Sequence, residues 1–195
     1  MYTRASMKNI IGVDEVGRGA WAGPLVVGAV LLNESISKIA DSKTLSAKIR
    51  EQLNEDIIKK ADFVGLGWAT ALEVDDLGLT KATTLACKRA LKNSPKNTTI
   101  TIDGSFNYLP ENKLVKTVVN ADAKVRSVSA ASIVAKVARD KYMKEQAVLY
   151  KNYGFESNVG YGTTKHCEAI KKYGLTPIHR WSYKPIKDFM DNYET

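Results

Sequence analysis

Residues 11–23, IGVDEVGRGAWAG, place charge where a buried strand would be expected to continue. The apolar run ends at Val13, and two adjacent carboxylates, Asp14 and Glu15, follow directly. A cation between two glycines, Gly17-Arg18-Gly19, comes next. Ligand sites of α/β proteins gather at such strand ends. The stretch therefore predicts a strand of an α/β sheet that ends at a functional site.

The sequence on either side supports an α/β fold. LVVGAVLL, which follows Pro24, is rich in Val and Leu and shorter than a typical helix, so it predicts a buried strand. Residues 98–102, TTITI, are β-branched and alternate in polarity, which is also typical of a strand. Further strands are predicted at residues 63–70 and 114–119, and helices at about 45–57, 79–91, 127–150 and 163–173.

Connections and helix ends follow from the same reading. Asp41-Ser42 is expected to cap the first helix, and Gly174 to stop the helix that ends near Tyr173. The first two strands leave no room for a helix between them, which favours antiparallel pairing, whereas later strands alternate with helices. We therefore expect a mixed sheet with helices on both faces. No repeat or linker divides the chain, so residues 1–195 are expected to form a single domain.

Composition limits the classes of function. The chain has 195 residues, of which 44% are hydrophobic and 26% charged, as in a globular protein. Lys and Arg number 29 against 21 Asp and Glu, which gives a net charge of +8 and a pI near 9.3. Such a balance favours a polyanionic partner such as nucleic acid. A basic charge that serves only solubility remains the alternative.

Cysteine content and hydropathy bear on location. Cys87 and Cys167 lie far apart with no CxxC spacing, so a structural zinc site is not expected and a reducing compartment is. Residues 1–9 lack the apolar core of a signal peptide, and no apolar run approaches the ~18 residues of a spanning helix. We expect a cytoplasmic protein without a membrane partner.

Acidic residues follow three predicted strands: Asp14-Glu15, Asp103 and Asp122. Converging carboxylates repel one another unless a cation neutralises them, and hard oxygen ligands favour Mg²⁺ or Mn²⁺. Two such ions can activate water and stabilise the leaving oxygen of a phosphodiester. Side chains alternate along a strand, so Asp14 and Glu15 share a site only if the strand twists or bulges or if Glu15 reaches round the rim. Each acid taken singly could instead cap a loop.

The glycine turn superficially matches a dinucleotide-binding loop. That motif requires a helix after its last glycine, whereas Pro24 and a predicted strand follow here, so we reject this reading. The glycines are better suited to let backbone amides approach a ligand while Arg18 offers a planar set of donors. A hairpin turn with a solvated arginine remains the simpler alternative.

Taken together, the motifs resemble one family, ribonuclease HII. The similarity lies in the order of the motifs along nearly the whole chain: GVDEVGRG with AGP, DSKTLS at 41–46, Ile102-Asp103-Gly104, Ala121-Asp122, SAASIVAK at 129–136 with Arg139-Asp140, Gly160-Tyr161, His166, and TPIHR at 176–180 with Ser182. The sister type, ribonuclease HIII, usually has Thr between the glycines and an additional N-terminal domain, whereas this chain has Arg18 and begins its first strand by about Lys8. The resemblance is therefore to type HII.

The resemblance implies an endonuclease that cuts the RNA strand of RNA/DNA hybrids and incises 5′ of single ribonucleotides in duplex DNA, a step of ribonucleotide excision repair. The implied fold is a ribonuclease H-like five-stranded mixed sheet flanked by helices, with a helical C-terminal segment from about residue 155. The protein would act as a monomer with Mg²⁺ or Mn²⁺. The metal-binding and catalytic acids would be Asp14, Glu15, Asp103 and Asp122. The substrate-binding residues would be Gly17, Arg18 and Gly19, which read the 2′-hydroxyl, Tyr161, which packs on the sugar, and Ser42 and Lys43, near the substrate backbone.

The chain departs from the family pattern at four places: Ala20-Trp21, where Pro and a small or aliphatic residue are usual; Ser105 in place of Asn; Gly162 in place of Pro; and Trp181 in place of Arg. His166 and His179 are expected to make structural hydrogen bonds.

Two other functions stay open on the residues alone. One is another carboxylate-metal nuclease or recombinase of the same fold, and the other is a non-catalytic nucleic-acid-binding domain.

Overall fold

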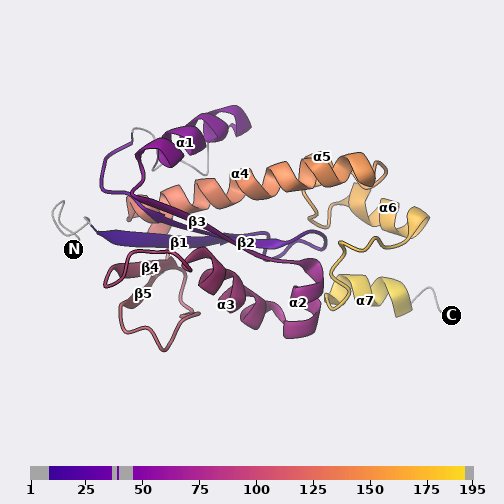
Figure 1. Cartoon of the computed structure of the whole chain (residues 1–195). Coiled ribbons are helices and arrows are strands. Elements are labelled where there is room, and N and C mark those ends of the chain that lie inside the picture. Colours follow the sequence, from indigo (N-terminus) through magenta and orange to yellow (C-terminus); the bar gives the residue numbers. More distant parts are fainter. Residues whose placement is uncertain (1–8, 37–38, 40–45, 192–195) are drawn as a thin grey trace.

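The computed structural model describes residues 9–36, 39 and 46–191, and within them the chain folds around a mixed sheet of five strands (Figure 1). The strands are β1 (Ile10–Val16), β2 (Leu25–Leu31), β3 (Phe63–Ala69), β4 (Thr99–Asp103) and β5 (Val115–Val118). Their order is β3-β2-β1-β4-β5. β2 pairs antiparallel with β1 and β3, and β4 pairs parallel with β1 and β5. The predicted mixed sheet and the antiparallel early strands are confirmed.

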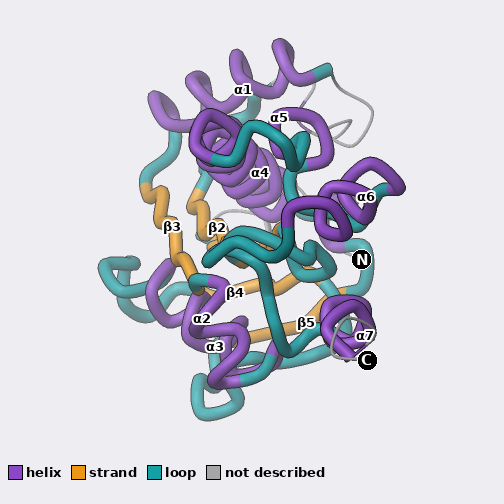
Figure 2. Tube along the Cα trace, turned by 90° about the vertical axis from the view of Figure 1, so that its right-hand side faces the viewer, coloured by secondary structure: helices purple, strands orange, loops and turns teal. Residues whose placement is uncertain are grey.

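Helices cover both faces of this sheet, as Figures 1 and 2 show. One face carries α4 (Arg126–Leu149), with α1 (Ala47–Lys60) packed on it. The other carries α3 (Leu79–Ala90) and the short α2 (Ala71–Leu77). Every residue of β2 is buried, because helices cover both of its faces and the alternation of a half-exposed strand is not needed.

The remaining helices form the C-terminal part, beyond the far end of α4 in Figure 1. They are α5 (Phe155–Asn158), α6 (Thr164–Tyr173) and α7 (Lys184–Asp191). Their apolar side chains form a separate cluster around Met143 of α4, Phe155, Ile170 and Ile186. This cluster holds the C-terminal segment against α4 and the turn between β1 and β2.

Three sequence predictions need correction. α1 begins at Ala47 and is capped by Ser46, whose hydroxyl accepts from the Ile49 amide at 3.4 Å, so Asp41-Ser42 is not its cap. α2 was not predicted, although Thr70 and Glu73 form a reciprocal capping box at its start. Its seven residues are too few to show a clear helical period.

The third correction concerns the acids. β1 continues through Asp14 and Glu15 to Val16, so both carboxylates belong to the strand. Asp122 lies in η2, the 3₁₀ turn Ala121–Ala123, some residues past the end of β5. Throughout the described ranges, every helix is too short or too polar to span a membrane.

Candidate active site

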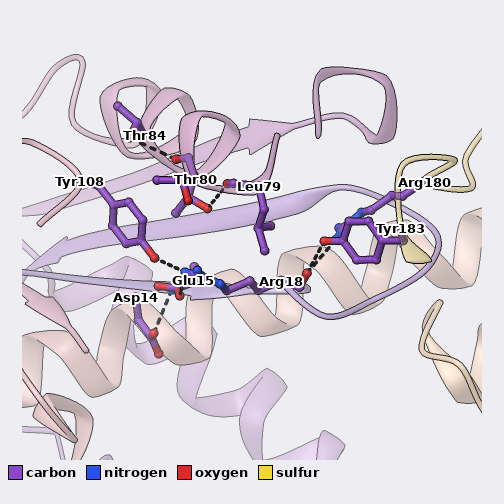
Figure 3. A network of polar contacts seen from close by, with 10 residues as sticks. Asp14, Glu15, Arg18, Leu79, Thr80, Thr84, Tyr108, Arg180 and Tyr183 are labelled. Carbon is purple, nitrogen blue, oxygen red and sulfur yellow. Dashed lines mark hydrogen bonds and ion pairs between the residues drawn. The ribbon is translucent and has the colours of Figure 1, made fainter. Parts of the chain in front are cut away.

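Asp14 and Glu15 project from opposite faces of the sheet. The ladder between β1 and β2 is regular there, with Asp14 opposite Gly28 and Glu15 opposite Val27. Without a bulge, adjacent side chains alternate. Asp14 lies on the α4 face, and Glu15 on the α3 face. Figure 3 shows Asp14 directed away from the group that Glu15 joins. This register excludes the bulge considered from sequence, and leaves a twist of the strand or Glu15 reaching round the rim as the ways in which the two acids could share a site.

Asp14 is held in an unfavourable environment for a charge. The pKa of its carboxyl is raised to about 7, chiefly by burial and also by the carboxylates of Glu15 and Asp103, while a hydrogen bond with Ser132 of α4 acts in the opposite direction. The Asp14 Oδ1 atom also accepts from the Glu15 amide at 2.8 Å. A bound cation would relieve this accumulation of negative charge.

Glu15 has a basic neighbour instead. The Arg18 Nη1 atom lies 3.4 Å from Glu15 Oε1 and also donates to the Tyr108 hydroxyl. Burial raises the pKa of Glu15, although the Arg18 charge opposes that shift. Sequence reasoning missed Tyr108, because a single tyrosine in the loop after β4 carries no recognisable motif. Ser132 of α4 lies within the motif at residues 129–136, but no role was predicted for it.

The other two acids lie at the ends of neighbouring segments. Val13 pairs with Ile102 in the parallel ladder, so Asp103, the last residue of β4, lies beside Asp14 and on the same face of the sheet. The Asp103 Oδ1 atom accepts from the Ala121 amide at 2.7 Å, which ties it to η2. Asp122, the next residue in η2, is 5% exposed. The structure thus brings three of the predicted acids into electrostatic contact and places Asp122 on the segment that binds Asp103.

These side chains do not yet surround one point. Within residues 9–36, 39 and 46–191, no three Asp, Glu, His or Cys side chains are grouped closely enough to hold a metal ion as they stand. The alternation of Asp14 and Glu15 across the sheet is one physical reason. Hard oxygen donors of high negative charge nonetheless fit Mg²⁺ or Mn²⁺ in kind. The four-acid metal site therefore remains a prediction.

The two glycines beside Arg18 have different structural roles. Gly17 has a φ of +80°, and a Cβ there would lie 2.1 Å from Arg139 Nε, so the fold requires glycine. Gly19 is exposed, its φ is outside the left-handed region, and within the described part of the chain no atom lies within 4 Å of the position a Cβ would take. Among the described residues, nothing explains why residue 19 lacks a side chain.

Arg139 of α4 is buried beneath the glycine turn and the residues that follow it. Its guanidinium donates to three carbonyls: Pro24 at 2.8 Å, Ala22 at 3.1 Å and Val159 at 2.9 Å. Burial lowers its pKa to about 10, which still leaves it charged at neutral pH. Arg139 thereby joins the glycine turn to the segment that carries Tyr161. Arg139 belongs to the family motifs in the sequence, but no role was predicted for it.

Tyr161 is held near the segment that follows the glycine turn. The amides of Trp21 and Ala22 donate to the Gly160 carbonyl at 2.8 and 3.1 Å. The Tyr161 ring is partly exposed, with its centre 5.6 Å from Arg139 Cζ. A tyrosine ring is therefore available next to Gly17-Arg18-Gly19. The other two predicted substrate residues, Ser42 and Lys43, lie outside the described residues.

Two departures from the family pattern explain each other. A Cβ on Gly162 would lie 2.2 Å from the ring atoms Cε2 and Cζ2 of Trp21. The large ring occupies the space that a side chain at 162 would need. Trp21 and Gly162 are therefore a compensating pair, and the sequence, which showed each change separately, gave no sign that they touch.

The two histidines make structural hydrogen bonds, as predicted. Their Nε2 atoms are 3.1 Å apart, His166 Nδ1 lies 2.9 Å from the Tyr161 carbonyl, and the Thr176 amide donates to His179 Nδ1 at 2.8 Å. Because the Thr176 N–H needs an acceptor, His179 carries its proton on Nε2 and donates it to His166. His166 then donates from Nδ1 to Tyr161. This neutral chain links the C-terminal loop to Tyr161.

Comparison with known proteins agrees with the fold and the motif order. The family model of Ribonuclease HII matches residues 11–186. Ribonuclease HII of Pelagibacter ubique is 45% identical over 189 residues, covering 94% of this chain and all of that protein. The crystal structure of ribonuclease H2 from Pyrococcus horikoshii has a TM-score of 0.81 at 27% identity, covering 95% of this chain and 99% of the other. Bst-RNase HIII in complex with Mn²⁺ shares the fold, with a TM-score of 0.73 at 20% identity, over 97% of this chain and 72% of its own.

Proposed function

Because the chain belongs to the ribonuclease HII family, we propose that it is an endonuclease that hydrolyses the RNA strand of RNA/DNA hybrids. We further propose that it incises 5′ of single ribonucleotides in duplex DNA, leaves 3′-hydroxyl and 5′-phosphate ends, and acts as a monomer with one catalytic domain over residues 1–195. The observation that supports this most directly is that one hairpin, β1–β2, carries Asp14 and Glu15 together with the glycine turn and its exposed Gly19.

The acids would hold the metal. Asp14, Glu15, Asp103 and Asp122 supply oxygen ligands of the kind that Mg²⁺ and Mn²⁺ prefer. When bound, two such ions would lower the pKa of the attacking water and stabilise the leaving oxygen. The raised pKa of Asp14 supports a cation there, because a divalent ion would stabilise the ionised carboxyl. The Mn²⁺ in the Bst-RNase HIII structure is consistent with this choice of ion.

Glu15 would have to change partners on the way to this state. Its carboxylate is close to Arg18, which also bonds Tyr108. Tyr108 can keep the guanidinium in place when Glu15 turns to the rim. Arg18 would then be left as a cation beside the acids, where it could face a phosphate of the nucleic acid.

The substrate would lie across the glycine turn. Gly17-Arg18-Gly19 would test for a ribose 2′-hydroxyl, Tyr161 would pack on the sugar, and Ser42 and Lys43 would contact the backbone. A site built to bond a hydroxyl rejects a substrate that lacks it, because its polar groups then go unpaired. The net charge of +8 would draw the polyanion to the surface.

The test is incision of a DNA duplex that carries one ribonucleotide, with Mg²⁺ and with excess EDTA. We expect cutting 5′ of the ribonucleotide only with the metal, and equal rates in EDTA would contradict the proposal. Asp14→Asn should abolish cutting while duplex binding survives, and Asp103→Asn and Asp122→Asn should act alike. Asp56→Asn, on the exposed side of α1, is the matched control and should cut normally.

A readout independent of turnover separates metal binding from chemistry. Mg²⁺ or Mn²⁺ should raise the melting temperature of the wild-type protein by mass action, and Asp14→Asn should reduce that rise. A variant that binds metal normally and yet fails to cut would move Asp14 from the metal site to another role.

A further inference from the structure

The peptide between Arg18 and Gly19 is fixed from the protein interior. The Arg18 carbonyl accepts from Arg180 Nη1 at 3.0 Å and from the Tyr183 hydroxyl (Figure 3). Arg180 Nη1 also donates to the Tyr183 hydroxyl at 2.7 Å, so the three groups form a closed triangle. Arg180 is fully buried, and Tyr183 packs against two apolar clusters. The Arg18 carbonyl is thus turned inward by two donors.

The segment that supplies these donors is itself held in place. The amides of Trp181 and Ser182 donate to the carboxylate of Asp75 in α2, at 2.8 and 2.9 Å, and the Ser182 hydroxyl donates to it at 2.6 Å. Arg180 Nε donates to the Gly23 carbonyl at 3.0 Å. Arg180 and Tyr183 therefore meet the glycine turn from a segment tied to α2 at one side and to the β1–β2 connection at the other.

The inward carbonyl determines where the next amide points. A trans peptide is planar, and its N–H is directed opposite to its C=O. The Gly19 N–H is therefore directed away from Arg180 and Tyr183. Gly19 is exposed, and among the described residues no hydrogen-bond acceptor takes up its amide. No atom of the described residues lies within 4 Å of the position that a Cβ on Gly19 would take, and this open space gives a ligand room to reach the donor.

We propose that Arg180 and Tyr183 are positioning residues that aim the Gly19 amide at the ribose 2′-hydroxyl, an inference that rests on the proposed function. Neither side chain touches the substrate. They act through the Arg18 carbonyl, so that a donor stands ready without reorganisation when the ribonucleotide arrives. Selectivity for ribose then depends on two side chains more than 160 residues away along the chain.

Tyr183→Phe tests this with little disturbance, because the ring and its packing remain and only the hydroxyl is lost. We measure dissociation constants in EDTA, where cutting does not interfere, for a DNA duplex with one ribonucleotide and for the same duplex without it. Loss of one hydrogen bond to the Arg18 carbonyl should reduce the preference for the ribonucleotide by roughly three- to tenfold. Binding of the all-DNA duplex should be unchanged, since the phosphate contacts are untouched.

Tyr153→Phe is the matched control. Its hydroxyl donates to the carbonyls of Gly174, at 2.8 Å, and Tyr173, at 3.2 Å, so the same substitution removes hydrogen bonds to backbone carbonyls at the end of α6. It should leave the preference at the wild-type value. Arg180→Lys keeps the charge but removes the paired donation to Gly23 and Arg18, and it should lower the preference in the same direction as Tyr183→Phe.

A second measurement covers the case in which a variant is destabilised. In ¹⁵N-glycine-labelled wild-type protein, the Gly19 amide resonance should move when the ribonucleotide duplex is added and stay when the all-DNA duplex is added. In Tyr183→Phe the two duplexes should give more similar shifts. A wild-type protein that binds both duplexes equally would contradict the proposed reading turn itself. A selective wild-type protein, with Tyr183→Phe indistinguishable from Tyr153→Phe in both measurements, would overturn only the positioning role.

Discussion

Gly19→Ala should make the protein slightly more stable and yet a poorer enzyme. Residue 19 is exposed, its backbone does not need positive φ, and no atom of the described residues lies within 4 Å of the added methyl group. Replacing glycine by alanine at a compatible position stabilises by about 0.4–1 kcal/mol, because the unfolded chain loses freedom. For a chain of this length that corresponds to a melting temperature about 1–4 °C higher.

The same methyl group occupies the space through which a sugar would reach the Gly19 amide. If the sugar is pushed away, a hydrogen bond is lost and the amide is buried without a partner, which costs about 1–3 kcal/mol. Cutting at a single ribonucleotide should therefore slow by roughly 5- to 150-fold under subsaturating substrate. Thermal unfolding and single-ribonucleotide incision, measured on the same preparation, give both quantities.

Gly17→Ala gives the contrast. Its φ of +80° and the 2.1 Å approach of a Cβ to Arg139 Nε predict a loss of stability as well as of activity. If Gly19→Ala cuts at the wild-type rate, the open space beside residue 19 is not used by the substrate. If Gly19→Ala melts as low as Gly17→Ala, the assignment of different roles to the two glycines is wrong.

Three further predictions concern stability. In metal-free protein the pKa of Asp14 is about 7 in the folded state, which exceeds its value in the unfolded chain. The free energy of unfolding should therefore fall by up to about 4 kcal/mol as pH rises from 4 to 7. Urea unfolding in EDTA should show that Asp14→Asn is more stable than the wild-type protein at pH 8, and no gain would contradict the burial of that charge. Burial and the neighbouring His166 lower the pKa of His179 to about 4, so the free energy of unfolding should fall by about 1.4 kcal/mol per pH unit as pH falls below about 6.5. In urea unfolding, His179→Gln should make the free energy of unfolding less dependent on pH between pH 7 and 5. An unchanged slope would count against the burial of a neutral His179. Gly162→Ala should lower the free energy of unfolding by about 1–3 kcal/mol, because its methyl group meets the Trp21 ring. In a double-mutant cycle, Trp21→Leu should recover part of that loss, whereas additive losses would show that the two residues do not compensate for each other.

Sequence patterns predicted the sheet well because its strands follow simple rules. β2 is continuously apolar and β4 alternates, so both were recognisable without tertiary information. α4 showed its length through a long run of small and apolar residues. α2 and the cap at Ser46 were missed, since a seven-residue helix has little periodicity and several polar residues before α1 could have served as its cap.

The four candidate acids are predicted from sequence, but their arrangement in space is not. The face of the sheet on which each carboxylate lies depends on the register between β1 and β2, and this register cannot be read from the sequence alone. Tyr108, Arg180 and Tyr183 reach the site from distant segments through single hydrogen bonds to Arg18. Local patterns carry no signal for such contacts.

The hydrogen bond between Tyr183 and the Arg18 carbonyl joins residues 165 positions apart. During synthesis the glycine turn leaves the ribosome long before Tyr183 does. The strand β1 can therefore form while the Arg18 carbonyl still lacks the hydrogen bond from Tyr183. Contacts of such long sequence separation are among the slowest to form, since much chain entropy is lost before they are made. A nascent chain should therefore gain its sheet before its capacity to distinguish RNA from DNA, and selectivity should be the last property to appear during folding.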